Sequence, residues 1–103
     1  MIRSFADRGT EDIWNGIDSK AARKTCPGDL WPRAHRKLDD LNQVRHYGDL
    51  RTPPSNRLHR LHRLHRLRAD RVAQWAIAIN NQYRICFRWE RIDAFDVEIT
   101  DYH

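Results

Sequence analysis

Large apolar residues alternate with other residues through both halves of the run Gln74-Trp75-Ala76-Ile77-Ala78-Ile79-Asn80-Asn81-Gln82-Tyr83-Arg84-Ile85-Cys86-Phe87-Arg88-Trp89. This run is the main determinant of the fold. A third alternating run, Phe95-Asp96-Val97-Glu98-Ile99-Thr100, follows it closely. Alternation rich in β-branched and aromatic residues is typical of strands with one buried face. Asn80-Asn81 separates the first two runs, and Asn tolerates the positive φ of a tight hairpin turn. We therefore predict a three-stranded antiparallel meander over residues 74–103, with a second turn near residues 91–93.

The alternation also predicts which face of the meander is buried. One face collects the large apolar side chains Trp75, Ile77, Ile79, Tyr83, Ile85, Phe87, Trp89, Phe95, Val97 and Ile99. The other face carries Arg84, Arg88, Glu98 and, if the alternation continues, Tyr102. We expect Arg88 and Glu98 to form an ordinary cross-strand ion pair.

Helices upstream are expected to cover the apolar face. Residues 2–5 alternate as a short strand, and Thr10 is a candidate N-cap of a helix over residues 11–17. That helix would bury Ile13, Trp14 and Ile17. A second helix would be capped by Asp29, with Pro32 in its first turn. Its apolar stripe consists of Leu30, Ala34, Leu38 and Leu41, and its solvent side of Arg33, Arg36, Lys37, Asp39 and Asp40.

These elements predict an α+β fold. An N-terminal strand and two to three helices would pack on one face of a twisted, mainly antiparallel sheet of about four to five strands. Residues 20–25 either extend the first helix or form a separate turn, residues 45–50 form one further turn, and residues 52–56 form a rigid, extended loop. The length of 103 residues fits a single domain over residues 1–103.

Charge is distributed unevenly along the chain. The net charge is +2 for residues 1–56, +5 for residues 57–71 and −2 for residues 72–103. A local arginine cluster favours a polyanionic partner such as nucleic acid, and the alternative is a solvated loop. Cys26 and Cys86 show no metal or redox spacing, so we interpret them as structural thiols. The sequence has no apolar N-terminal targeting segment and no membrane-spanning run, which predicts a cytoplasmic protein without membrane contact.

Residues 57–67 contain the triplet Arg-Leu-His three times, followed by Arg66-Leu67. A period of three fits neither the alternation of a strand nor the face of an α-helix. The repeat is therefore interpreted as a tandem duplication. We expect part of it to enter the sheet as a strand, and part to form an enlarged loop or a short helical turn.

Several motifs resemble the HigB toxins of the RelE-like (RelE/ParE) superfamily of type II toxin–antitoxin systems. They are Pro53-Pro54-Ser55-Asn56-Arg57-Leu58, the segment 65–71, the run 74–89 and the terminal Asp96-Val97-Glu98-Ile99-Thr100-Asp101-Tyr102-His103. The resemblance covers essentially the whole chain and implies a RelE-like fold. It also implies a ribosome-dependent endoribonuclease that cleaves mRNA in the A site of the 70S ribosome without a cofactor. A HigA-type helix-turn-helix antitoxin would neutralise it, and operator DNA would be contacted only through that antitoxin.

The resemblance further implies a set of catalytic residues: His65, Arg68, Arg84, Asp101, Tyr102 and His103. Arg68 stands where the family has Lys, and Ala69 where it has Gly. The repeat leaves the first histidine ambiguous among His59, His62 and His65. Counting back from Asp70-Arg71 selects His65, and counting forward from Asn56-Arg57-Leu58 selects His59. We prefer His65, because sheet register ties it to the strand that must hold it.

These residue types suit RNA cleavage without a metal ion. Histidine titrates near neutral pH, so His65 and His103 can serve as acid and base, with Asp101 as a base or as an orienter of a histidine. Arg68 and Arg84 can hold the scissile phosphate with forked hydrogen bonds. Tyr102 can stack on a base or bind the phosphate. Further RNA contacts are expected from Arg57, Arg60, Arg63, Arg66 and Arg71.

Other interpretations of the same residues remain. The repeated histidines could bind zinc if they were helical, but no Cys or carboxylate completes such a site nearby, so we expect no metal. A terminal Asp-Tyr-His outside a resemblance is usually a frayed tail. The duplication could also have displaced His65 and Arg68, which would leave a RelE-like protein that binds RNA or a HigA-type antitoxin without cleaving RNA.

Overall fold

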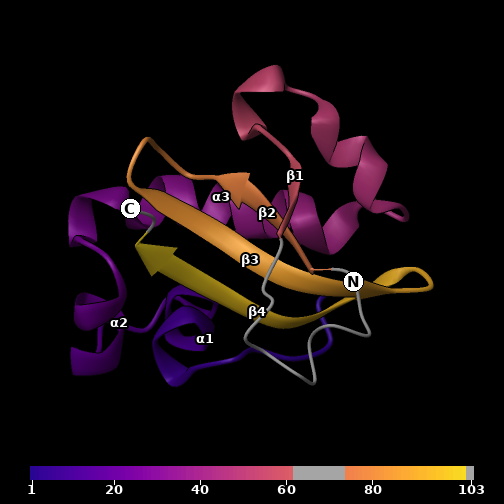
Figure 1. Cartoon of the computed structure of the whole chain (residues 1–103). Helices are drawn as coiled ribbons and strands as arrows, with labels where there is room; N and C mark the ends of the chain where they lie inside the picture. Colours follow the sequence, from indigo (N-terminus) through magenta and orange to yellow (C-terminus); the bar gives the residue numbers. More distant parts are fainter. Residues whose placement is uncertain (62–73, 102–103) are drawn as a thin grey trace.

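A computed structural model describes residues 1–61 and 74–101 of the chain, and Figure 1 shows their arrangement. Four antiparallel strands form one sheet in the order β1-β2-β3-β4. Their bounds are β1 His59–Leu61, β2 Gln74–Ala78, β3 Tyr83–Glu90 and β4 Asp93–Asp101. The predicted meander over the last third of the chain is therefore confirmed, and the repeat contributes its expected strand as β1. Residues 62–67 of the repeat lie outside the described residues.

The two turns of the meander are built differently. In the β2–β3 turn, Asn80 Oδ1 accepts hydrogen bonds from the backbone N–H groups of Gln82 (2.9 Å) and Tyr83 (2.7 Å). The hairpin turn predicted at Asn80-Asn81 is confirmed, but neither residue has the positive φ on which the prediction was based. The Asn80 side chain instead replaces a backbone acceptor and closes the turn. The β3–β4 turn does contain a left-handed residue, Arg91, with φ of 59°.

A bulge in β4 overturns part of the predicted alternation. Asp96 has φ of 53°, and the β3–β4 register shifts between Cys86 and Arg88. An inserted residue moves the side chains that precede it in the strand to the opposite face of the sheet. Ala94 therefore enters the core in place of Phe95, and the Arg88 guanidinium lies 4.9 Å from the centre of the Phe95 ring.

The expected Arg88–Glu98 pair is also absent, because the same bulge changes the partners of Arg88. Its Nε lies 2.9 Å from Asp96 Oδ2, and its guanidinium forms a second ion pair with Glu90. Glu98 is paired in the register with Cys86.

The N-terminal strand is reduced to two isolated parallel bridges, Ile2 with Ala94 and Phe5 with Val97. Arg3 N–H donates to Ala94 O at 2.7 Å, so this segment follows the outer edge of β4. The sheet proper is antiparallel, and this edge is its only parallel contact among the residues described.

The first helix begins earlier than predicted. α1 spans Arg8–Asn15 and is capped by Asp7, whose carboxylate accepts from Thr10 N–H at 2.7 Å. Thr10 is thus inside the helix and not its cap, because its hydroxyl is used elsewhere in the fold. Gly16 ends the helix in the left-handed conformation, and Ile17 beyond it is 48% exposed instead of buried. Residues Lys20–Thr25 form a separate short helix, α2, capped by Ser19.

The second predicted helix, α3, spans Trp31–Gln43 and follows a 3₁₀ turn, η1, at Gly28–Leu30. Asp29 lies within η1 and gives α3 no side-chain cap, so that assignment is wrong, whereas Pro32 does lie in the first turn. Ala34, Leu38 and Leu41 are fully buried, as the apolar stripe predicts. They pack in one core with Ile77, Ile79, Ile85, Phe87, Trp89, Val97 and Ile99, and Figure 1 shows α3 running behind the strands.

Two further 3₁₀ turns connect α3 to the sheet, η2 at Tyr47–Arg51 and η3 at Pro54–Asn56. The loop over residues 52–56 is therefore turned and not extended throughout. Asn56 is fully buried, and its side-chain N–H donates to Leu50 O at 3.0 Å. Arg57 follows with φ of 50°, which redirects the chain into β1.

Candidate active site

Arg84 lies at the centre of the sheet face opposite the helices, which we call the Arg84 face. In the register, Ala78 of β2 is paired with Arg84, and Arg84 is paired with Thr100 of β4. Directly paired residues in antiparallel strands project from the same face, so these three residues form one row across the sheet. Arg84 is only 8% exposed, which differs from the solvated position expected for this face. β2 and β3 are the central strands, flanked by β1 and β4, and this position favours burial.

A second row on the same face brings chemically active side chains together. His59 is paired with Ala76, Ala76 with Cys86, and Cys86 with Glu98. His59 Nδ1 lies 2.9 Å from Arg57 O, which orients the imidazole in β1. The Arg84 face therefore carries a histidine and an arginine in adjacent rows. His59 is the histidine that the forward spacing selects.

Asp101 occupies the other side of the pleat from Arg84. It is paired with Tyr83, and its Oδ2 accepts a hydrogen bond from Gln82 Nε2 at 3.0 Å. Burial raises the pKa of Tyr83, and the negative charge of Asp101 raises it further. The sheet therefore aims the Asp101 carboxylate toward the Tyr83 side, one residue away from the row that holds Arg84.

Several predicted site residues lie outside the described part of the chain. They are His65, Arg68, Tyr102 and His103 among the catalytic set, and Arg63, Arg66 and Arg71 among the RNA-binding set. Of the remaining predicted RNA-binding residues, Arg57 precedes β1 and Arg60 is exposed within it. The choice among His59, His62 and His65 stays a prediction.

A cavity of about 300 Å³ opens on the Arg84 face beside the β4 bulge. Its charged lining residues are Arg88, Asp96 and Glu98, so its charges are mixed. The ion pairs of Arg88 with Asp96 and Glu90 compensate its positive charge. This cavity is consequently a poor anion site, although it adjoins the row of Cys86 and Glu98.

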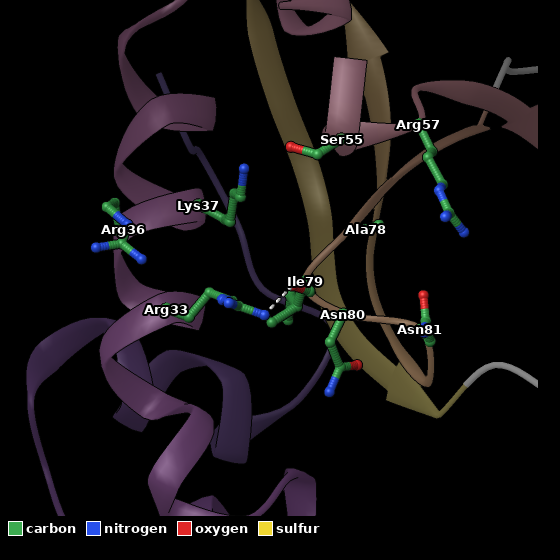
Figure 2. A pocket seen from close by; sticks show the side chains of 9 residues that line it. All are labelled: Arg33, Arg36, Lys37, Ser55, Arg57, Ala78, Ile79, Asn80 and Asn81. Atoms are coloured by element: carbon green, nitrogen blue, oxygen red, sulfur yellow. Dashed lines mark hydrogen bonds between the residues drawn. The ribbon is translucent and has the colours of Figure 1, made fainter. Parts of the chain in front are cut away.

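A second pocket, which the sequence did not reveal, is strongly basic. It has a volume of about 380 Å³ and lies between α3, the end of η3 and the β2–β3 turn. Figure 2 shows the residues that line it, Arg33, Arg36, Lys37, Ser55, Arg57, Ala78, Ile79, Asn80 and Asn81. We call it the basic pocket. Arg33 and Arg36 are exposed, as predicted for the solvent side of α3, and Lys37 is half-buried. Their i, i+3 and i+4 spacing indicates a basic stripe on the helix but not the pocket that the stripe helps to form.

The comparison with protein families decides the identity of the fold. A model of the family described as RelE-like toxin of type II toxin–antitoxin system HigB matches residues 3–103. The chain belongs to this family of HigB-like toxins. A comparison with curated proteins finds no significant match. The α+β architecture with a four-stranded antiparallel sheet agrees with the RelE-like fold of the family.

Membership of the HigB-like family makes the chain a toxin of a type II toxin–antitoxin system, with an antitoxin as its partner. Such toxins generally inhibit translation as ribonucleases.

Within residues 1–61 and 74–101, no cluster of three or more His, Cys, Asp or Glu side chains is arranged to hold a metal ion. No helix in the same part of the chain has the length and apolar character needed to cross a membrane.

Cys26 and Cys86 are both buried. Burial, aided by the nearby charge of Asp29, raises the pKa of the Cys26 thiol to about 11. The Cys26 thiol therefore stays protonated near neutral pH and acts as a packing group, because the thiolate is the reactive form.

Proposed function

We propose that this HigB-like toxin is a ribosome-dependent endoribonuclease that cleaves mRNA in the A site by metal-free acid/base catalysis. The observation that carries the proposal is the placement of Arg84. Its guanidinium is buried on the sheet face opposite the helices, in a strand that is paired on both sides. A cation held in this way stabilises the negative charge of a phosphorane without rearranging, and such preorganised stabilisation is usually the largest single contribution to catalysis.

The proposed roles follow from the chemistry of the side chains. Arg84 and Arg68 hold the scissile phosphate. Of His65 and His103, one takes the proton from the attacking 2′ hydroxyl and the other gives a proton to the leaving 5′ oxygen. Asp101 lies across the pleat from Arg84, which suits an orienter of a neighbouring group better than a direct phosphate contact. Tyr102 stacks on a base of the unpaired codon or bonds the phosphate.

The proposed partners are the 70S ribosome with its mRNA and a HigA-type helix-turn-helix antitoxin. Arg57, Arg60, Arg63, Arg66 and Arg71 contact RNA phosphates in this scheme. Operator DNA is reached only through the antitoxin. The proposed location is the cytoplasm, where these partners occur.

A second candidate function is a RelE-like protein that binds RNA or the antitoxin without cleavage. The triplet repeat favours it, since the repeat changes the spacing between Asn56 and Asp70. The two functions differ in one measurable property: the binding protein leaves growth and mRNA intact when it is expressed alone.

Growth arrest on induced expression of the chain tests the proposal. Wild type is expected to stop growth, whereas His103→Ala and Arg84→Gln are expected to restore it. Loss of a phosphate-stabilising arginine costs about 10²–10³ in rate, and loss of an acid or base costs about 10²–10⁴. Arg45→Gln, which removes an exposed charge elsewhere, is the matched control and is expected to stay toxic. A folded, fully toxic His103→Ala variant would overturn the assignment of the terminal residues. A folded wild type without toxicity would favour the binding protein.

A further inference from the structure

The basic pocket concentrates positive charge in a small part of the described surface. Four of its nine lining residues are cations, and none is a carboxylate. None of the ion pairs formed between described residues involves Arg33, Arg36, Lys37 or Arg57. Uncompensated cations around a concave surface raise the local positive potential and attract anions.

Neutral partners hold two of these cations, Arg33 and Lys37, in place. Arg33 Nη1 donates to Ile79 O at 3.4 Å, and Lys37 Nζ donates to the side-chain oxygen of the buried Asn56. Figure 2 shows Arg33 reaching from α3 toward the β2–β3 turn, and Arg57 and Asn81 facing one another on the other side of the pocket. Carbonyl and amide oxygens orient a cation without cancelling its charge. The pocket is therefore prepared for an anion before the anion arrives.

The pocket adjoins the row that contains Arg84. Ala78 lines the pocket and is paired in the register with Arg84. Arg57 lines the same pocket and belongs to the segment with the highest net charge in the chain. A strand of RNA bound across the Arg84 face can thus continue past the β2–β3 turn into the pocket.

We propose that the basic pocket binds a backbone phosphate of the substrate RNA, at a position outside the scissile phosphodiester. The choice of RNA as the polyanion rests on the proposed function. Phosphate fits the site because Arg33 and Arg57 offer forked donors, and Asn80 and Asn81 add amide donors beside them. The volume of about 380 Å³ lies at the small end for ligand sites, which suits one nucleotide unit.

Binding of a cleavage-resistant RNA tests the proposal without requiring catalysis. The probe is a short fluorescent oligouridylate with 2′-O-methyl riboses, whose blocked 2′ oxygen cannot attack the phosphate. The test variant is Arg33→Gln/Arg57→Gln, and the control is Lys20→Gln/Lys24→Gln, which removes two exposed charges from α2. Thermal melting of both variants establishes that they are folded.

The affinity of the test variant for the probe is expected to be lower than that of wild type by a factor of at least roughly ten, because charged hydrogen bonds are lost. Its slope of log affinity against log salt is expected to fall by about 0.7, the value for one lost phosphate contact to a single strand. Arg33→Lys/Arg57→Lys keeps the charges and is expected to restore the salt slope. The Lys20→Gln/Lys24→Gln control is expected to bind like wild type.

Equal loss of affinity in the test variant and the control would overturn the proposal, because general charge would then explain binding. A folded test variant that binds the probe with wild-type affinity would also overturn it. So would a test variant that loses binding to a fluorescent poly-glutamate peptide but keeps binding to RNA. The result is separate from catalysis. If the wild type binds the probe but never cleaves RNA, and the test variant loses probe binding, the proposed function is refuted and the phosphate site is supported.

Discussion

Thr10 Oγ1 accepts a hydrogen bond from the backbone N–H of Ile99 at 3.0 Å, joining α1 to β4 across 89 positions of sequence. Both residues are buried, and Thr10 is fully enclosed. Ile99 lies two residues before Asp101, so this bond fixes the end of the strand that leads into the predicted terminal site. The hydroxyl of Thr10 is used for tertiary structure, and Asp7 caps the helix in its place.

Replacing Thr10 with Val is expected to destabilise the protein while preserving its shape. The buried Ile99 N–H would lose its acceptor, which costs about 1–3 kcal/mol. The melting temperature should fall by roughly 4–8 °C for each kcal/mol in a domain of this size. The control is Thr100→Val, a half-buried neighbour in β4. A Thr10→Val variant that melts with wild type would show that the bond adds nothing to stability.

Asn56→Ala is expected to lower both stability and RNA affinity. Asn56 is fully buried, donates to Leu50 O and accepts from Lys37. Its loss leaves that carbonyl without this donor, at a cost of about 2 kcal/mol, and releases Lys37 and the turn that carries Arg57. Thermal melting and probe binding measure the two effects. Asn15→Ala, at the exposed end of α1, is the control. Unchanged RNA affinity in a destabilised Asn56→Ala variant would separate the pocket from this residue.

Asp12 makes stability depend on acid pH. The Ser19 hydroxyl donates to its Oδ2 at 2.6 Å and lowers the pKa of the carboxyl, burial opposes this effect, and Arg8 lowers the pKa further. Since the folded-state pKa is depressed, the contribution is fully present above the ordinary value of 3.8 and is lost as pH falls through the folded value.

The variant Asp12→Asn should therefore melt below wild type at neutral pH, and the gap should narrow as pH falls below 3.8. Melting curves across this range measure the gap. Asp18→Asn, which changes an exposed carboxylate paired with Arg23, is the control and should show a smaller gap. A gap that stays constant from neutral pH to below 3.8 would contradict the account of Asp12.

The sequence predicted the elements whose side chains pack, because packing imposes a period. The stripe of Ala34, Leu38 and Leu41 and the alternation of Ile77, Ile85 and Val97 all enter the core. Phe95 was placed on the wrong face, since a bulge depends on one left-handed residue, Asp96, that leaves the residue pattern unchanged. The cap predicted at α1 failed because the Thr10 hydroxyl accepts from Ile99 N–H instead. The cap predicted at α3 failed because Asp29 lies within the 3₁₀ turn η1 that precedes the helix.

The candidate site divides in the same way. Residues in the meander, such as Arg84, could be placed from the alternation, although its burial could not. The basic pocket could not be predicted, because it forms where Arg33 of α3 meets the β2–β3 turn, and that meeting depends on helix position and not on spacing. The roles of His65, Arg68, Tyr102 and His103 rest on the family resemblance and remain predictions.

Ribosome-dependent cleavage can be measured by primer extension on a translated reporter transcript after induction of the isolated chain. New 5′ ends are expected within the coding region of the reporter. They are expected to disappear when the start codon of the same transcript is changed so that ribosomes no longer translate it. Identical cuts in the untranslated transcript, or intact mRNA beside a folded protein, would contradict a ribosome-dependent nuclease.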